Sequence, residues 1–305
     1  MDRHRCRFRK YRVTTSPSTA APSWERIVDG IDFGEGPRWH NGRLWFSDFF
    51  QHTISSVGDD GVRRVELEYD GQPSGLGWLP DGRLLFVSML DQRVMRVEDD
   101  GTVIEHADLE GIAGGPCNDM VVGSMGNAYV GNFGFDMFGG ADFATSTLAI
   151  VWADGAVTAA SDADNMAFPN GSVITDDEST LIVGESFGAQ FTAFTITHDR
   201  RLTERRVWAE VPGMAPDGCT IDAEGAIWFS DATGKQVVRV KEGGEITDRL
   251  PTPDNTYACM LGGHDGRTLF VLTCSDSRPE VVAGAGTGVL LATEVAVPRG
   301  PNSRP

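Results

Sequence analysis

Oxygen-bearing side chains recur at one position of a repeating pattern in this sequence. Glu35 lies between two glycines in Phe-Gly-Glu-Gly-Pro-Arg-Trp (33–39), and Asn118, Asn170 and Asp217 hold the matching position in later segments. Each of these residues precedes a turn by seven or eight residues. Glycine beside such a residue lets the backbone turn and lets another group approach closely. We therefore expect these side chains to meet and to bind one metal ion.

Two carboxylates and two amide carbonyls are the ligands of a hard cation, and they favour Ca²⁺. Catalytic zinc usually takes nitrogen or sulfur ligands, so Zn²⁺ ranks below Ca²⁺, with Mg²⁺ and Mn²⁺ as further candidates. Ser74 and Asp119 are outer members of the same set. Any one of these Asn-Gly or Asp-Gly pairs alone is ordinary turn chemistry. Their common position in several repeats favours a shared site.

The elements that position these residues form six similar blocks. The blocks begin near Pro37, Pro73, Pro116, Pro169, Pro216 and Tyr257. Each block combines an apolar strand, a turn rich in Asp and Gly, and a second apolar strand. The second strands are expected at 43–48, 83–88, 127–132, 180–185, 226–231 and 268–273. This repeat predicts an all-β fold, a six-bladed β-propeller with the metal site in its central channel. A two-sheet sandwich would not explain six copies of one pattern.

Composition limits the function classes. The chain has 305 residues and a net charge of −18, which argues against nucleic acid as a partner. Five cysteines without zinc or disulfide spacing indicate reduced thiols and a cytoplasmic protein. The basic N-terminus has no apolar stretch behind it, so we expect no secretion signal and no membrane partner. We expect a monomer or a small homo-oligomer.

The sequence predicts one folded domain. Residues 1–22 are expected to form a disordered arm, or to follow from a start site placed too far upstream. Residues 23–298 are expected to form the propeller, and residues 299–305 a flexible C-terminal tail.

The same motifs carry a family resemblance. Gly34-Glu35-Gly36-Pro37, Asn118-Asp119, Pro169-Asn170-Gly171 and Pro216-Asp217-Gly218 resemble the gluconolactonase, senescence-marker-protein (regucalcin) and luciferin-regenerating-enzyme family over roughly residues 27–295. The resemblance implies a six-bladed propeller with one divalent metal in its axial channel. It implies that Glu35, Asn170 and Asp217 ligate the metal, and that Asn118 is a fourth ligand or a substrate contact. Relatives hydrolyse lactones, and some hydrolyse organophosphates.

One departure from the family pattern bears on the substrate. Sugar-lactone members commonly carry an arginine two residues before the Asn-Asp pair, where this chain has Pro116. The neighbourhood is apolar instead, and residues 132–140 are expected to form a loop over the channel mouth. The candidate substrate contacts are Asn118, Asp119, Ser74, Met89, Phe133, Phe135, Phe187 and Glu185. These residues favour a lactone or ester less polar than a sugar lactone, although some of the aromatic residues are expected to be core.

In the expected reaction the metal polarises the lactone carbonyl. Asp217 acts as general base for a water molecule or attacks directly as a nucleophile, and we favour the general base. Glu185 is a second acidic candidate, although a surface position at a strand end fits it better. Three alternatives remain open: a non-catalytic binding propeller with a structural metal, a metal-dependent phosphotriesterase, and a condensing or isomerising enzyme on the same scaffold.

Overall fold

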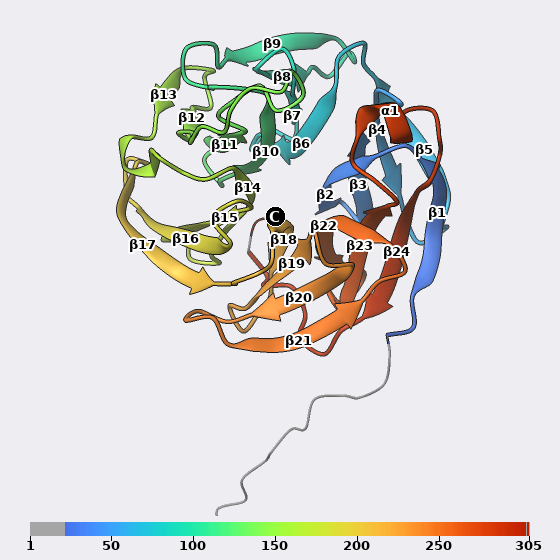
Figure 1. Cartoon of the computed structure of the whole chain (residues 1–305). Coiled ribbons are helices and arrows are strands. Elements are labelled where there is room, and N and C mark those ends of the chain that lie inside the picture. The colour runs from blue at the N-terminus through green and yellow to red at the C-terminus, as the bar shows by residue number, and fades with distance from the viewer. Residues whose placement is uncertain (1–21, 303, 305) are drawn as a thin grey trace, which may run out of the picture.

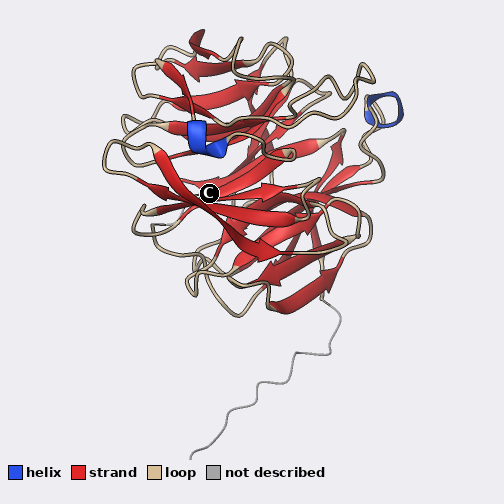
Figure 2. Ribbon diagram, turned by 60° about the vertical axis from the view of Figure 1, so that its left-hand side comes forward, coloured by secondary structure: helices blue, strands red, loops and turns tan. Residues whose placement is uncertain are grey.

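The computed structural model describes residues 22–302 and 304, so the predicted arm at 1–22 lies almost wholly outside the described residues. The described chain forms six four-stranded antiparallel sheets arranged around one axis (Figure 1). The predicted all-β six-bladed propeller is confirmed, and the sandwich is excluded. Figure 2 shows how little helix the fold contains.

Four consecutive strands build each of the first five blades, from the channel outward. The first blade has β2 (Gly34–His40), β3 (Arg43–Asp48), β4 (Thr53–Val57) and β5 (Arg63–Glu68). The second has β6 (Pro73–Trp78), β7 (Leu84–Ser88), β8 (Arg93–Val97) and β9 (Val103–Asp108). The third has β10 (Cys117–Val122), β11 (Ala128–Asn132), β12 (Ala149–Val151) and β13 (Val157–Ala159). The fourth has β14 (Pro169–Ile174), β15 (Thr180–Glu185), β16 (Gln190–Ile196) and β17 (Leu202–Glu210). The fifth has β18 (Pro216–Ile221), β19 (Ile227–Asp231), β20 (Gln236–Val240) and β21 (Ile246–Pro251).

The sixth blade joins the two ends of the propeller. It contains β22 (Asn255–Gly262), β23 (Thr268–Cys274), β24 (Gly288–Glu294) and, as its outer strand, β1 (Glu25–Ile31). In Figure 1 the blue β1 lies along the red β24, and the two strands pair antiparallel. The repeat pattern does not reveal β1. The pairing closes the ring without leaving the blade one strand short.

Alternation of apolar side chains explains why the blades stack. The buried side chains form separate clusters, each of which draws residues from neighbouring blades, such as Val173 of β14 with Phe229 of β19. A single blade could not bury both of its faces alone. Two short helices, η1 (Ser161–Ala163) and α1 (Pro279–Val282), lie in connecting loops. Among the described residues, none of the helices has the length and apolar character needed to cross a membrane.

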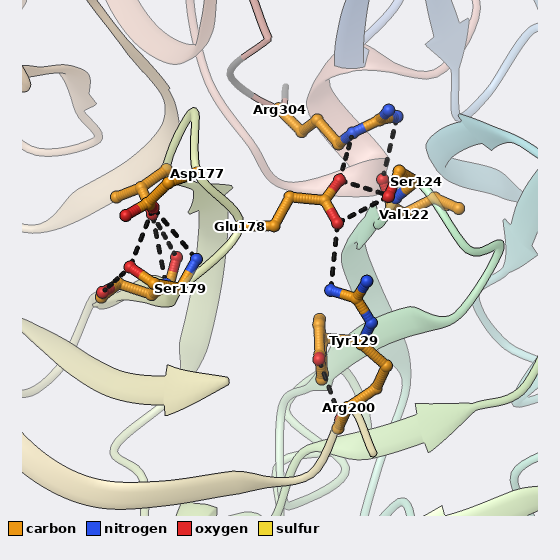
Figure 3. A network of polar contacts seen from close by, with 10 residues as sticks. Val122, Ser124, Tyr129, Asp177, Glu178, Ser179, Arg200 and Arg304 are labelled. Atoms are coloured by element: carbon orange, nitrogen blue, oxygen red, sulfur yellow. Dashed lines mark hydrogen bonds and ion pairs between the residues drawn. The ribbon is translucent and has the colours of Figure 1, made fainter. Parts of the chain in front are cut away.

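The C-terminal residues cross the face of the propeller at the far ends of the first strands. Arg299 pairs with Asp222, which follows β18, and Arg304 pairs with Ile174 of β14. The Arg304 side chain also forms an ion pair with Glu178 at 3.2 Å (Figure 3). The expected tail, residues 299–305, is therefore held against the fourth and fifth blades at its described positions.

Candidate metal and active site

The first strand of every blade is bulged at the same place. In β2 the pairing register shifts between Glu35 and Arg38, and the other first strands shift at equivalent points. A bulge bends its strand and re-aims the side chain at the bulge. Glu35, Ser74, Asn118, Asn170 and Asp217 all lie at these bulges. The structure thus places the predicted residues at one level of the central channel.

Glycines after the bulge residues let neighbouring first strands touch. A β-carbon added to Gly171 would lie 2.5 Å from the carbonyl oxygen of Asp217, and one added to Gly218 would lie 2.6 Å from the β-carbon of Ala258. No larger residue fits at such separations without moving the backbone. The close approach brings short side chains on neighbouring blades within reach of each other.

Glu35 and Asp217 are buried carboxylates that lie close enough for their charges to interact. Each has only 8% of its surface exposed. Burial raises the pKa of Glu35 well above its ordinary value, and the nearby charges of Asp217 and Asp119 raise it further. Burial likewise raises the pKa of Asp217, although a hydrogen bond from Gly218 and one with the Asn170 side chain oppose the increase. Two buried carboxylates held this close are stabilised in their charged forms by a cation between them.

The donor set fits such a cation. The Asn170 amide group donates to the Ser186 hydroxyl at 3.2 Å, and Ser186 donates to the Pro216 carbonyl at 2.7 Å. This chain of bonds fixes the Asn170 side chain beside Asp217. Asn118 holds the same level on β10 and is similarly buried.

All of the candidate ligand atoms in this set are oxygen atoms. Within residues 22–302 and 304, no group of three or more His, Cys, Asp or Glu side chains is arranged to hold a metal. The set here is instead two carboxylates with two amides, which suits a hard cation better than zinc. The buried cysteines are free thiols, and burial raises the pKa of Cys117 to about 12, so this thiol stays protonated.

Asp119 is already paired inside the protein. Its Oδ1 accepts hydrogen bonds from Arg38 Nη2 at 2.5 Å and from the Met120 backbone at 2.8 Å. We expected Asp119 to contact the substrate, and the structure shows that one of its oxygens is engaged by an arginine from another blade. Arg38 was missed by sequence reasoning. Ser74 is nearly fully buried, and its carbonyl oxygen lies against Gly36.

Aromatic side chains surround the channel at the end where the first strands begin. Met89, Phe133 and Phe135 belong to one buried cluster with Phe168 and Tyr257. Met89 has no exposed surface, so this predicted substrate contact is a core residue. Phe133 and Phe135 retain a small exposed edge.

Phe187 is 55% exposed and extends this cluster to the surface. Its ring stacks on Phe168 at 4.7 Å, and Phe168 stacks on Phe133 at 4.3 Å. Phe168 has a φ of +61°, which is unusual for an aromatic residue. It directly precedes Pro169 and Asn170. No sequence signal marked this residue as part of the site.

The loop between β11 and β12 includes residues 133–140 of the expected segment, whose first residue, Asn132, ends β11. It carries exposed apolar side chains at Met137, Phe138 and Phe143, and Phe143 contacts the Phe187 ring at 5.8 Å. The loop therefore continues the aromatic surface beside the channel mouth.

Glu185 is buried, which corrects the surface position that we expected. Only 2% of it is exposed, and its oxygens accept bonds from the Ala167 backbone at 2.7 Å and from Gln190 Nε2 at 2.9 Å. Thr192 donates to it as well. Because the backbone N–H of Ser186 donates to the Phe168 carbonyl at 3.0 Å, this network fixes the segment that carries Phe168 and Asn170. Glu185 positions the site and does not face the channel as a free carboxylate.

Comparison with known proteins agrees with this geometry. The model of the SMP-30/Gluconolactonase/LRE-like region matches residues 33–275. Pentonolactonase XacC of Haloferax volcanii is 27% identical over 299 residues, which cover 92% of this chain and 97% of that protein. A 6-deoxy-6-sulfogluconolactonase of Pseudomonas putida is 30% identical over 96 residues, or 30% of this chain and 33% of that protein.

Solved structures share the fold. A regucalcin of Agrobacterium tumefaciens, described as calcium-binding, superposes with a TM-score of 0.77 at 20% identity, covering 92% of this chain and 96% of its own. A gluconolactonase of Xanthomonas campestris gives a TM-score of 0.71 at 23% identity, with 89% of each chain covered. The matched region contains all the bulge residues of the channel, and this chain belongs to the SMP-30/gluconolactonase/LRE-like family.

Proposed function

We propose that this protein is a calcium-dependent hydrolase that opens a lactone less polar than a sugar lactone. The observation that carries the proposal is the pair of buried carboxylates, Glu35 and Asp217, at one level of the channel with two amides. Arg38, whose charge acts on Glu35, is engaged by Asp119. The lactonase relatives support the reaction class, and the calcium-binding regucalcin supports a divalent cation.

Glu35, Asn170, Asp217 and Asn118 would hold the cation. When bound, Ca²⁺ would polarise the lactone carbonyl and stabilise negative charge on its oxygen. The alternatives Mg²⁺, Mn²⁺ and Zn²⁺ would supply the same chemistry, and the oxygen-only donor set favours Ca²⁺.

The residues of the chain would handle the water molecule and the proton. Asp217 is proposed as the general base: it takes a proton from water while the water oxygen bonds to the carbonyl carbon. The bond from that carbon to the ring oxygen then breaks, and the ring oxygen takes the proton that Asp217 accepted from the water. In the alternative, an Asp217 oxygen attacks the carbonyl carbon itself, the ring oxygen leaves and takes a proton, and water later attacks the Asp217 carbonyl carbon of the resulting anhydride, which releases the substrate carboxylate.

A single turnover in ¹⁸O-labelled water distinguishes these two roles of Asp217. General-base catalysis puts the label into the product carboxylate at once. Nucleophilic attack leaves the first product unlabelled and puts ¹⁸O on the Asp217 side chain, which mass spectrometry of the protein would detect.

The apolar character of the channel mouth supports the choice of substrate. Pro116 stands where an arginine could bind sugar hydroxyl groups, and the aromatic rings of Phe168 and Phe187 lie beside the channel entrance. An alkyl or aryl substituent on the lactone would bury its surface against these rings, and each buried methylene contributes about 0.8 kcal/mol.

The first test is acid release from a panel of lactones, from an aldonolactone to aryl and alkyl lactones. Activity should vanish after chelation and return when Ca²⁺ is restored. Asp217→Asn should lower kcat by at least about 100-fold, since a positioned base typically contributes that much. The matched control is Asp248→Asn, on the outer strand β21 of the same blade, which should keep full activity.

Other results would redirect the proposal. Hydrolysis of an aryl phosphotriester without lactone turnover would favour the phosphotriesterase alternative. Tightly held calcium without any turnover would favour a binding propeller. Full activity in Asp217→Asn with the fold retained would contradict the assignment of the site.

A further inference from the structure

Arg38 lies on the first blade, but its guanidinium group reaches the third. Its Nε donates to the Leu76 carbonyl of β6 at 3.0 Å. Its Nη2 donates to Asp119 Oδ1 at 2.5 Å and to the Met120 carbonyl at 2.6 Å, both on β10. Nη1 donates to the Pro37 carbonyl at 2.8 Å. The buried side chain therefore joins three adjacent first strands immediately beside the carboxylate pair.

Two sequence features make room for this contact. The third blade carries Asp119 after its bulge residue Asn118, where the blades with Ser74, Asn170 and Asp217 carry glycine. On β6, a β-carbon added to Gly75 would lie 2.7 Å from Asp119 Oδ1. Only the glycine leaves space for the Asp119 carboxylate between the strands.

Asp119 is a third acidic group within electrostatic reach of the channel. It directly follows the proposed ligand Asn118 on β10, only 6% of its surface is exposed, and its Oδ1 accepts a bond from Arg38. A buried carboxylate that loses its basic partner is strongly unfavourable unless another cation replaces that partner. Arg38 and a metal ion in the channel would therefore be two positive charges that stabilise the same group of acidic side chains, Glu35, Asp119 and Asp217.

We propose that Arg38 is a positioning residue that limits the negative charge of the metal site. It cancels the charge of Asp119 and holds β10 in place, so that a cation meets two uncompensated carboxylates and not three. This inference rests on the proposed function, because it concerns the same cation. Arg38 also lines a cavity of about 860 Å³ at the opposite end of the first strands.

Calcium titration of the purified full chain by isothermal calorimetry at pH 8 tests the inference without relying on activity. Arg38→Met should bind Ca²⁺ about 10-fold more tightly or better, since it leaves Asp119 as an uncompensated charge near the ion. Asp119→Asn should bind about 10-fold more weakly, because the Arg38 charge then repels the ion. The double variant, which removes both charges, should return to within about threefold of the wild type, because the charge near the ion is then the same as in the wild type.

The matched control is Arg239→Met in the fifth blade. Arg239 forms an equally buried pair with Asp222 at 2.7 Å, five residues along the chain from Asp217. This variant should lose thermal stability and keep the wild-type calcium affinity. Arg38→Lys retains the charge and should also keep the affinity, with lower stability because the forked geometry is lost.

Unchanged or weaker calcium binding in a folded Arg38→Met variant would overturn the inference and leave the proposed function intact. Should that variant fail to fold, Asp119→Asn and the double variant carry the same test, and equal affinities in those two would overturn it. No calcium binding by the wild type would refute the proposed calcium site itself, and the inference with it.

Discussion

The acidic side chains of the channel differ in what surrounds them. Glu35 and Asp217 lack a basic partner among the described side chains, whereas Asp119 is paired with Arg38 and Glu185 accepts several hydrogen bonds. The residue type alone does not separate these roles. Burial together with the available donors does, and on this basis we propose cation binding for the first pair and positioning for the other two.

Phe187 offers a prediction at the scale of one residue. Phe187→Ala would remove the exposed ring that stacks on Phe168. We expect KM for an aryl or alkyl lactone to rise about 10-fold, because about 1–3 kcal/mol of apolar contact is lost. KM for an aldonolactone should change less than about twofold, since it has no apolar substituent to bury.

Val207→Ala is the control for this prediction. Val207 is as exposed as Phe187 but lies on the outer strand β17. Its kinetic constants should match those of the wild type for every substrate. An equal rise in KM for polar and apolar lactones in Phe187→Ala would contradict an apolar substrate pocket.

Sequence could locate some of these residues and not others. The shared register identified Glu35, Asn170 and Asp217, because equivalent positions of a repeat converge on one axis. It missed Arg38, since the partner Asp119 is 81 residues away in the chain and an arginine on a strand is ordinary. It missed Phe168, because a positive φ cannot be read from an aromatic residue before proline.

At the scale of the element, the bulged first strand determines how the site is built. The bulge aims one side chain at the axis, and the glycine that follows allows the next strand to approach. Apolar alternation made the second strands predictable, and β3 (Arg43–Asp48) and β15 (Thr180–Glu185) have the expected bounds. β1 was not predictable, because it pairs with β24 from the other end of the chain.

Gly171→Ala tests the importance of this close approach. The added methyl group would lie 2.5 Å from the Asp217 carbonyl oxygen, so β14 and β18 must separate. We expect unfolding free energy to fall by about 1–3 kcal/mol, as for other overpacked sites. Calcium affinity should fall as well, because Asn170 and Asp217 would no longer be held at one separation.

Gly184→Ala provides the comparison within the same blade. Its added methyl group would come no closer than 3.2 Å to a neighbouring atom, a ring carbon of Phe191. Chemical denaturation and calcium titration of both variants give the two quantities. The same loss of calcium affinity in both variants would show that the Gly171 contact has no special role in the site.

At the scale of the whole molecule, ring closure and the C-terminal segment hold the blades together. Glu178, in the turn after β14, accepts bonds from the Ser124 backbone and hydroxyl at 2.8 and 2.6 Å, and from Arg200 at 3.1 Å (Figure 3). It also forms the ion pair with Arg304. One carboxylate thus links the third blade, the fourth blade and the C-terminal segment.

The pKa of Glu178 gives this link a pH dependence. Burial alone would raise the pKa, but the bonds from Ser124 and the charges of Arg304 and Arg200 hold it below the ordinary value of glutamate. A carboxylate with a lowered pKa in the folded state stabilises the protein fully above its unfolded pKa, near 4.5, and the stabilisation is lost as the pH falls through the folded value.

Glu178→Gln should therefore lower the melting temperature at pH 7 by several degrees, since about 1–3 kcal/mol is lost with such charged hydrogen bonds. The difference from the wild type should shrink as the pH falls below about 4.5. Asp177→Asn is the matched control, because the bonds of Asp177 among the described residues are with Thr175 and Ser179 of its own turn. Its effect on the melting temperature at pH 7 should be smaller, because no contact between blades is lost.

Calorimetry at pH 7 and pH 4 measures the melting temperatures of both variants. A difference between Glu178→Gln and the wild type that stays constant over this range would show that the carboxylate charge does not link the blades.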